Sequence, residues 1–177
     1  MLIYLNSLAD DILLGLYRIG KGREEEKRGE QELLVEMLCS EVELSHNEDG
    51  KPLVEGYHIS ISHTKGYVAI ILSQKHQVGI DIEYRSERVK RISKRFLRSD
   101  EHFTETEDLL TVWCVKETIY KLFSEDHLTY QDMKVDIQNK IATNLMKSRD
   151  VTFVIASTHE YILTYACLLY TSDAADE

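Results

Sequence analysis

The chain has 177 residues, of which 43% are hydrophobic and 29% are charged, and its formal net charge is −10. This length suits one substantial core or two small cores packed together, and the acidic balance argues against a general affinity for nucleic acid, which clustered cations drive. The first residues have no basic leader, and Asp10 and Asp11 interrupt their apolar run. We therefore expect a cytoplasmic protein with neither a signal peptide nor a membrane span.

Segments with strand-like composition stand on both sides of two segments with helical spacing of apolar residues. The first part of the chain predicts a strand at 1–6, a helix at 24–42, a turn at 46–50, and an antiparallel meander of strands at 58–62, 67–73 and 78–83. The second part predicts helices at 88–96 and 109–123 and strands at 133–138, 151–157 and 161–165. Strands, helices and strands in this order indicate the α+β class.

The last eleven residues, 167–177, read CLLYTSDAADE and look like the translation of a sequencing-library adapter. If they are not native, they lie outside any reasoning about the fold. The alternative is that Cys167 to Tyr170 extend the last strand into a frayed tail.

The most informative stretch is VGIDIE, Val78 to Glu83. In a strand, Val78, Ile80 and Ile82 share one face, so Asp81 and Glu83 point together to the other. Two carboxylates so close repel each other unless water or a cation lies between them, and hard oxygen ligands suit magnesium. The alternative interpretation of these residues is an ordinary exposed strand face.

A second stretch, WCVKETIYK, places Trp113, Glu117 and Lys121 on one ridge of a helix at intervals of four residues. An acid and a base therefore project together beside a large aromatic ring. Glu117 can complete a metal site, and Lys121 can meet a phosphate oxygen. The alternative is a Glu–Lys helix pair of the kind that stabilises many helices by a few tenths of a kcal/mol.

Two further stretches carry groups that hold phosphate. In HISISHTKG, Ser62 and His63 lie where a strand runs into a turn marked by glycine, and hydroxyls, imidazoles and free amides at such a place can bind phosphate oxygens. Gly50, Lys51 and Pro52 form a turn that presents a lysine. The alternatives are a hydrogen-bonded structural histidine and a routine surface turn.

The positive charge is concentrated in one window of this acidic chain. This window, residues 85–98, has a net charge of +6, so the rest of the chain carries −16. It holds one acid, Glu87, and seven basic residues: Arg85, Arg88, Lys90, Arg91, Lys94, Arg95 and Arg98. Such an island suggests an anionic partner, either a phosphorylated small molecule or an acidic protein surface. The alternative is a solvated helix face.

Taken together, GKP, SISHT, VGIDIE and WCVKETIYK occur in an order and at a spacing that resemble the 4'-phosphopantetheinyl transferases, in particular the larger, surfactin-synthetase-activating type. The resemblance runs from Gly50 to Lys121 and includes RFLRSDEH, Arg95 to His102. It implies an α+β pseudo-dimer of two similar halves, residues 1–83 and 84–166, related by an approximate twofold with coenzyme A between them.

The resemblance also implies roles for individual residues. Asp81, Glu83 and Glu117 would bind magnesium, and Glu117 would also deprotonate the carrier serine. Lys121 would contact the pyrophosphate, and Glu101 matches a further acidic position. Contacts with the nucleotide phosphates are implied for Lys51, Ser62 and His63, with Arg28 the best candidate for a basic contact from the N-terminal region. With a carrier protein as partner, five residues of the basic island are expected to form the surface that docks it: Arg85, Arg88, Arg91, Lys94 and Arg95.

The implied activity transfers the phosphopantetheine arm of coenzyme A to a serine of an acidic acyl or peptidyl carrier protein, with Mg²⁺ as cofactor and a monomeric enzyme. One departure stands out, because Ser124, Glu125, Asp126 and His127 replace the glycines that commonly follow the last lysine. Two rivals remain: another magnesium-dependent phosphoryl enzyme such as a hydrolase, and a non-catalytic module whose charged surfaces serve protein contacts.

Overall fold

A computed structural model of the protein describes residues 1–9 and 11–169. Its first half contains β1 (Leu2–Ala9), β2 (Ile12–Arg18), α1 (Arg23–Leu38), β3 (Ser45–His46), β4 (Pro52–Leu53), β5 (His58–Thr64) and β6 (Tyr67–Ser73). From here on the second half is taken to begin at β7, because this strand belongs to the second sheet. It contains β7 (Gln77–Tyr84), α2 (Arg88–Phe96), α3 (Thr106–Leu122), the 3-10 turns η1 (Ser124–Asp126) and η2 (Tyr130–Asp132), β8 (Met133–Asp136), β9 (Ile141–Asn144), β10 (Arg149–Ser157) and β11 (Tyr161–Leu168). The α+β class is confirmed.

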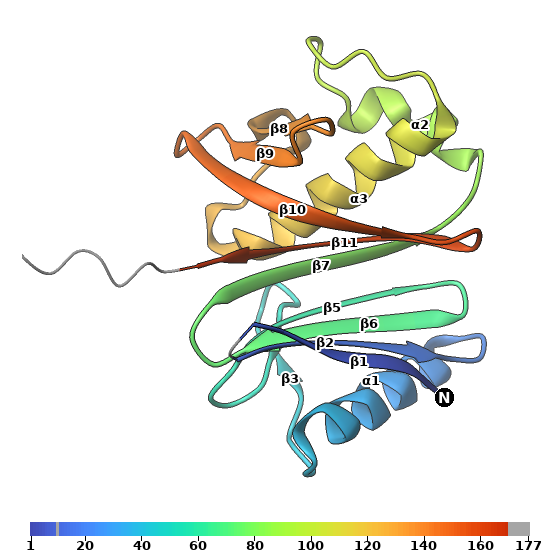
Figure 1. Ribbon diagram of the computed structural model, residues 1–177, viewed down its shortest axis with the longest axis vertical. Coiled ribbons are helices and arrows are strands. Elements are labelled where there is room, and N and C mark those ends of the chain that lie inside the picture. The colour runs from blue at the N-terminus through green and yellow to red at the C-terminus, as the bar shows by residue number, and fades with distance from the viewer. Residues whose placement is uncertain (10, 170–177) are drawn as a thin grey trace, which may run out of the picture.

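The strands form two main antiparallel sheets that lie between layers of helix (Figure 1). One sheet has the order β1-β2-β6-β5 and the other the order β7-β11-β10-β9-β8, while β3 and β4 pair separately. Helix α1 packs through Leu33 and Leu34 on the outer face of the first sheet. Helix α3 covers the outer face of the second sheet and α2 packs against α3, while an apolar layer that includes Leu16, Ile71 and Ile80 joins the two sheets.

Side-chain hydroxyls connect the first sheet to the second. Backbone N–H groups on the free edge of β7 donate to hydroxyl oxygens of β5 at 3.1–3.2 Å, in the pairs Ile80 to Ser60, Ile82 to Ser62 and Tyr84 to Thr64. A strand edge otherwise leaves these donors to water, and a buried N–H without an acceptor is costly. The hydroxyls of β5 therefore replace a missing neighbour strand and hold the two halves together.

The predicted three-stranded meander is wrong in its third strand. β5 and β6 pair as expected, but β7 pairs with β11 in the second sheet. The physical reason is that β6 is already flanked by β5 and β2, so neither of its edges is free. The strand β2 was not predicted, whereas the helices at 88–96 and 109–123 are confirmed, the second beginning three residues earlier than expected.

The final strand reaches into the segment that resembles an adapter. Cys167 and Leu168 belong to β11 and pair with Val78 and Gln77 of β7. The rest of that segment, from residue 170 onward, lies outside the described residues. Within the described chain, no helix combines the length and the apolar character needed to cross a membrane.

Gly79 lets α3 approach β7 closely. A Cβ atom built on Gly79 would lie 2.4 Å from the carbonyl oxygen of Thr118 and 3.0 Å from the Cβ of Leu122. Any side chain at this position would therefore push the helix away from the strand. The glycine of VGIDIE is thus explained by packing, and it fixes how near α3 comes to the two carboxylates of the same strand.

We expect Gly79→Ala to lower the free energy of unfolding by about 3 kcal/mol, the upper range for overpacking, because a helix carbonyl cannot rotate out of the way. The change should also alter the fluorescence of Trp113, the single tryptophan, which lies on the same helix. Urea unfolding monitored by this fluorescence measures both effects. As a control, Gly56→Ala introduces a Cβ with no atom within 4 Å at a φ of +79°, so it should cost stability through backbone strain and leave the native emission unchanged.

Candidate active site

The two faces of β7 differ as the sequence predicts. Val78, Ile80 and Ile82 are at most 4% exposed and lie in the apolar layer between the sheets. Asp81 and Glu83 alternate with them, and both side chains make hydrogen bonds to residues of α3. The alternation of VGIDIE therefore brings two carboxylates to the boundary between strand and helix.

Asp81 is a buried carboxylate whose two oxygens have different surroundings. Its Oδ1 accepts hydrogen bonds from Ser62 Oγ and from Lys121 Nζ, each at 2.7 Å. Lys121 Nζ also donates to the carbonyl oxygen of Ile80 at 3.1 Å. The other carboxylate oxygen, Asp81 Oδ2, is buried and has no hydrogen-bond partner among the described residues. Because an unsatisfied buried charge is costly, this oxygen is a suitable ligand for a cation.

Glu83 is held by the indole of Trp113, whose Nε1 donates to Glu83 Oε1 at 2.8 Å. Burial raises the pKa of Glu83 to about 7, the negative charge of Asp81 adds to the rise, and the Trp113 hydrogen bond opposes it. The Trp113 ring lies between Phe96 and Tyr130, with centroids 5.1 and 5.4 Å away. An aromatic cluster therefore fixes the donor that orients Glu83.

Glu117 accepts a hydrogen bond from the hydroxyl of Tyr130 at 2.7 Å. Burial raises its pKa, the Tyr130 hydrogen bond lowers it, Asp81 raises it further and Lys121 lowers it. Tyr130 is a site residue that was not identified from the sequence. It lies in the 3-10 turn η2, where no helical or strand periodicity marks which way a side chain points.

The oxygen donors fit a magnesium ion in chemistry and charge. Besides burial, the charge of Asp81 raises the pKa of both Glu83 and Glu117, the charge of Glu117 also raises that of Glu83, and Asp81 Oδ2 lacks a partner within the described chain. Carboxylate oxygens are what magnesium prefers. In this conformation, however, the Lys121 ammonium supplies the positive charge beside Asp81, and the described residues contain no cluster of three or more His, Cys, Asp or Glu side chains arranged to hold a metal.

A cleft of about 210 Å³ lies beside these residues. Lys51 lines it together with Glu117 and Lys121, so the structure brings the predicted lysine turn to the helix motif. The turn is fixed by Asn47, whose Oδ1 accepts the backbone N–H of Lys51 at 2.8 Å, and by the positive φ of Gly50. The other residues that line the cleft are Asp49, Gly50, Pro52, Ile59, Ser60, Ile61, Tyr120, Ser124 and His127.

Ser62 and His63, predicted to act together on phosphate, point to different elements. Ser62 donates to Asp81, whereas His63 faces α1. There His63 Nε2 lies 3.4 Å from Glu30 Oε1, and Nδ1 lies 4.0 Å from Glu26 Oε2. Successive side chains of a strand project to opposite faces, which explains the separation. Two glutamates beside His63 make its surroundings in this structure unfavourable for an anion.

Arg28 and Glu101 are engaged elsewhere in the structure. The Arg28 side chain is 63% exposed and pairs with Glu25 at 2.6 Å and Glu32 at 3.5 Å on α1. Glu101 is buried and accepts hydrogen bonds from Lys116 Nζ at 2.7 Å and from the backbone N–H groups of Arg98 and Val135, each at 3.0 Å. The buried Lys116–Glu101 ion pair thus connects α3 to the loop after α2 and to β8.

Of the basic island, Arg85 is engaged by other residues. It forms an ion pair with Glu107 and donates to Ser157 Oγ at 2.5 Å. By contrast, Arg88 and Arg95 of α2 line a hollow of about 270 Å³ together with Glu83 and Trp113. Two of the cations predicted to meet a carrier protein therefore lie next to the carboxylate site.

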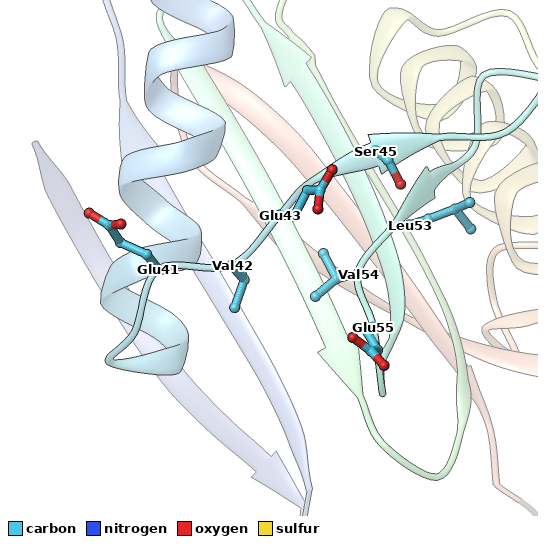
Figure 2. A pocket seen from close by; sticks show the side chains of 7 residues that line it. All are labelled: Glu41, Val42, Glu43, Ser45, Leu53, Val54 and Glu55. Carbon is cyan, nitrogen blue, oxygen red and sulfur yellow. The ribbon is translucent and has the colours of Figure 1, made fainter.

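A larger hollow of about 710 Å³ lies in the first half, between the loop after α1 and β4 (Figure 2). Three glutamates, Glu41, Glu43 and Glu55, line it together with Val42, Ser45, Leu53 and Val54. Because no lysine or arginine of the described residues lines this hollow to offset its carboxylates, a polyphosphate is repelled there. The charge distribution therefore favours the smaller cleft as the phosphate site.

The sequence of this chain matches the model of a known protein family. Residues 77–166, just over half of the chain, match the model of the 4'-phosphopantetheinyl transferase superfamily. The chain belongs to this superfamily. The matched segment contains Asp81, Glu83, Glu117 and Lys121 and begins after the turn that carries Lys51 and the strand that carries Ser62.

One curated relative is a 4'-phosphopantetheinyl transferase named gsp from Aneurinibacillus migulanus. The two sequences are 33% identical over 84 residues, which is 42% of this chain and 35% of the relative. The match therefore spans about a third of the length of that relative.

The raised pKa of Glu83 predicts a pH-dependent stability for this superfamily member when EDTA removes divalent ions. The unfolded chain releases the Glu83 proton near 4.5, whereas the folded chain retains it up to about 7, so the free energy of unfolding should fall as pH rises between those values. Glu83→Gln should make this fall less steep, since only Glu117 then remains with a carboxyl pKa raised at this site. Urea unfolding at pH 4.5–8 measures the slope, and Glu41→Gln, an exposed change in the loop after α1, should leave it as in the wild type.

Proposed function

We propose that the protein transfers 4'-phosphopantetheine from coenzyme A to a serine of an apo acyl or peptidyl carrier protein, an activity of the holo-carrier-protein synthase type. The products are the holo carrier protein and adenosine 3',5'-bisphosphate. One observation carries the proposal: Asp81 of β7 contacts Lys121 of α3, the charge of Glu117 reaches Glu83 of the same strand, and Glu117 and Lys121 line a cleft together with Lys51. Family membership supports the reaction type.

In this proposal Asp81, Glu83 and Glu117 hold the magnesium ion. Bound there, magnesium polarises the phosphoryl group and offsets the charge of the leaving group. Lys121, which lines the cleft and touches Asp81, contacts the pyrophosphate of coenzyme A. Lys51, which lines the same cleft, meets the nucleotide phosphates.

Glu117 serves as the general base. Its raised pKa makes it a better proton acceptor than an ordinary surface glutamate, and it lines the cleft in which the reacting groups would lie. The carrier serine oxygen forms a bond to the β-phosphorus of coenzyme A as its proton passes to the Glu117 carboxylate. The bond from that phosphorus to the oxygen of adenosine 3',5'-bisphosphate breaks.

We further propose that the protein is of the larger, surfactin-synthetase-activating type, a monomeric and cytoplasmic enzyme built as a pseudo-dimer. Support comes from the layer order, because each half consists of a sheet with helix on its outer face. The cleft between Lys51 of one half and Glu117 of the other is where such a type would hold coenzyme A between its halves.

Intact-mass spectrometry tests the reaction directly. With coenzyme A, magnesium and a panel of apo carrier proteins, one carrier should gain the mass of phosphopantetheine. Asp81→Ala and Glu117→Ala should each lower kcat/KM by about 100-fold or more, in the range for loss of a general base or an electrostatic contact. Release of phosphate without carrier modification would instead identify a hydrolase. A protein that coenzyme A and magnesium do not stabilise against heat would be a binding module without this activity.

We propose that α2 docks the carrier protein. Arg88 and Arg95 line the hollow that contains Glu83, and Arg91 and Lys94 lie on the same nine-residue helix. Carrier proteins of this kind are usually acidic, and the remainder of this chain is negative, so attraction is concentrated at α2. The bound carrier would then present its serine close to Glu83 and Trp113.

Replacing Arg88 and Arg91 together with glutamate should raise the apparent KM for the carrier by about tenfold, because charge steering is reversed. The affinity for coenzyme A should change little. Steady-state kinetics at two salt concentrations measure both values, and the difference between variant and wild type should shrink at high salt. Lys75→Glu with Lys140→Glu makes the same change in net charge at exposed positions outside α2 and should leave the KM unchanged. An unaltered KM in the α2 variant would remove the docking assignment.

A further inference from the structure

The loop that follows α3 forms part of the wall of the phosphate cleft. In this loop Ser124 and His127 stand where the resemblance leads one to expect glycines, and both line the cleft together with Lys51 and Lys121. A glycine loop would offer only backbone there. This chain instead offers a hydroxyl and an imidazole beside two lysines.

The loop is fixed in place by the second sheet. Asp126, between the two residues, accepts hydrogen bonds from Asn144 Nδ2 at 2.9 Å and from Lys147 Nζ at 2.5 Å. Asn144 is fully buried at the end of β9. His127 follows with a φ of +48°, a left-handed conformation that a non-glycine residue adopts at a cost. The fold therefore holds the His127 backbone in a disfavoured conformation at the rim of the cleft.

Ser124 supplies a second, independent observation. Its Oγ is buried, yet among the described residues it has no hydrogen-bond partner. A buried hydroxyl without a partner destabilises a protein, so its presence calls for a partner that binds from outside the chain. Because Ser124 lines the cleft, a ligand in the cleft can provide that partner.

The position of His63 strengthens the case for a replacement contact. The imidazole of His63, which is predicted to contact phosphate, faces Glu26 and Glu30 of α1 in this structure. His127 lines the cleft together with both lysines, although Asp49 and Glu117 also line it. His127 therefore lines the cleft in this structure, whereas the His63 side chain lies beside two glutamates of α1.

We propose that Ser124 and His127 bind phosphate oxygens of coenzyme A, with the Ser124 hydroxyl as a hydrogen-bond donor and the His127 imidazole as a second donor. This inference rests on the proposed function and assigns to that same cleft two specificity-determining residues from the loop after α3. The lysines supply charge, and the loop supplies directional donors. The contact forms no covalent bond and requires no further reactant.

Titration calorimetry with coenzyme A and magnesium tests the contact. Ser124→Ala and His127→Ala should each raise the Kd for coenzyme A by about tenfold, the loss expected for one hydrogen bond to a charged group. Adenosine 3',5'-bisphosphate and 3'-dephospho-coenzyme A serve as further probes. A penalty that disappears with the dephospho compound places the contact at the 3'-phosphate, and one that persists places it at the pyrophosphate.

The apparent melting temperature without ligand separates a binding role from a structural one. Because Ser124→Ala removes an unsatisfied hydroxyl, the ligand-free variant should melt at the same temperature as the wild type or higher. His159→Ala, in the turn between β10 and β11, is the matched histidine control and should bind coenzyme A as the wild type does.

The outcomes separate this proposal from the proposed function. A wild-type protein that binds coenzyme A and modifies a carrier, with Ser124→Ala and His127→Ala unchanged in Kd, overturns the loop contact alone. A wild-type protein that neither binds coenzyme A nor modifies any carrier overturns both. Weaker binding with an unaltered melting temperature supports the contact.

Discussion

At Gly79 the backbone of α3 comes so close to β7 that a Cβ atom would lie 2.4 Å from the carbonyl oxygen of Thr118. This approach places the ridge of α3 directly against the carboxylates of the strand. Trp113 and Lys121 are eight residues apart on the helix, a rise of about 12 Å, and they contact Glu83 and Asp81, which are two residues apart on the strand, a rise of about 7 Å. Glu117 lies between them on the helix. The close approach at Gly79 therefore brings the regularly spaced side chains of the helix next to the alternating carboxylates of the strand.

The cluster has more negative charge than its own donors neutralise. The indole of Trp113 and the hydroxyl of Tyr130 orient Glu83 and Glu117 without adding positive charge, and Lys121 is the one cation hydrogen-bonded to Asp81 among the described residues. The raised pKa values of Glu83 and Glu117 follow first from burial and then from this excess of negative charge. A divalent ion would relieve the repulsion, which is why the donor set supports the magnesium proposal more strongly than the D-x-E spacing alone.

The sequence predicted those features that depend on local periodicity. The alternation of Val78, Ile80 and Ile82 and the ridge of α3 repeat within one element, so the strand and the helix were both identifiable. The neighbour of β7 was not, because strands compete for sheet edges and β2, which occupies an edge of β6, went unpredicted. The contacts of Tyr130 and of the Lys116–Glu101 pair were beyond reach for a related reason. They join residues from separate elements whose meeting is set by tertiary packing.

The site spans the contact between the two halves, and this placement explains how it keeps its shape. The family match begins at residue 77, yet Ser62 and Lys51 lie before it and meet Asp81 and the cleft. Separating β5 from β7 would leave three N–H groups on the edge of β7 without their hydroxyl acceptors and would remove the Ser62 hydrogen bond from Asp81. Because each lost partner is costly when buried, the hydroxyls that join the halves also hold the carboxylate in position. The cleft is thus preorganised by the same hydrogen bonds that connect the sheets.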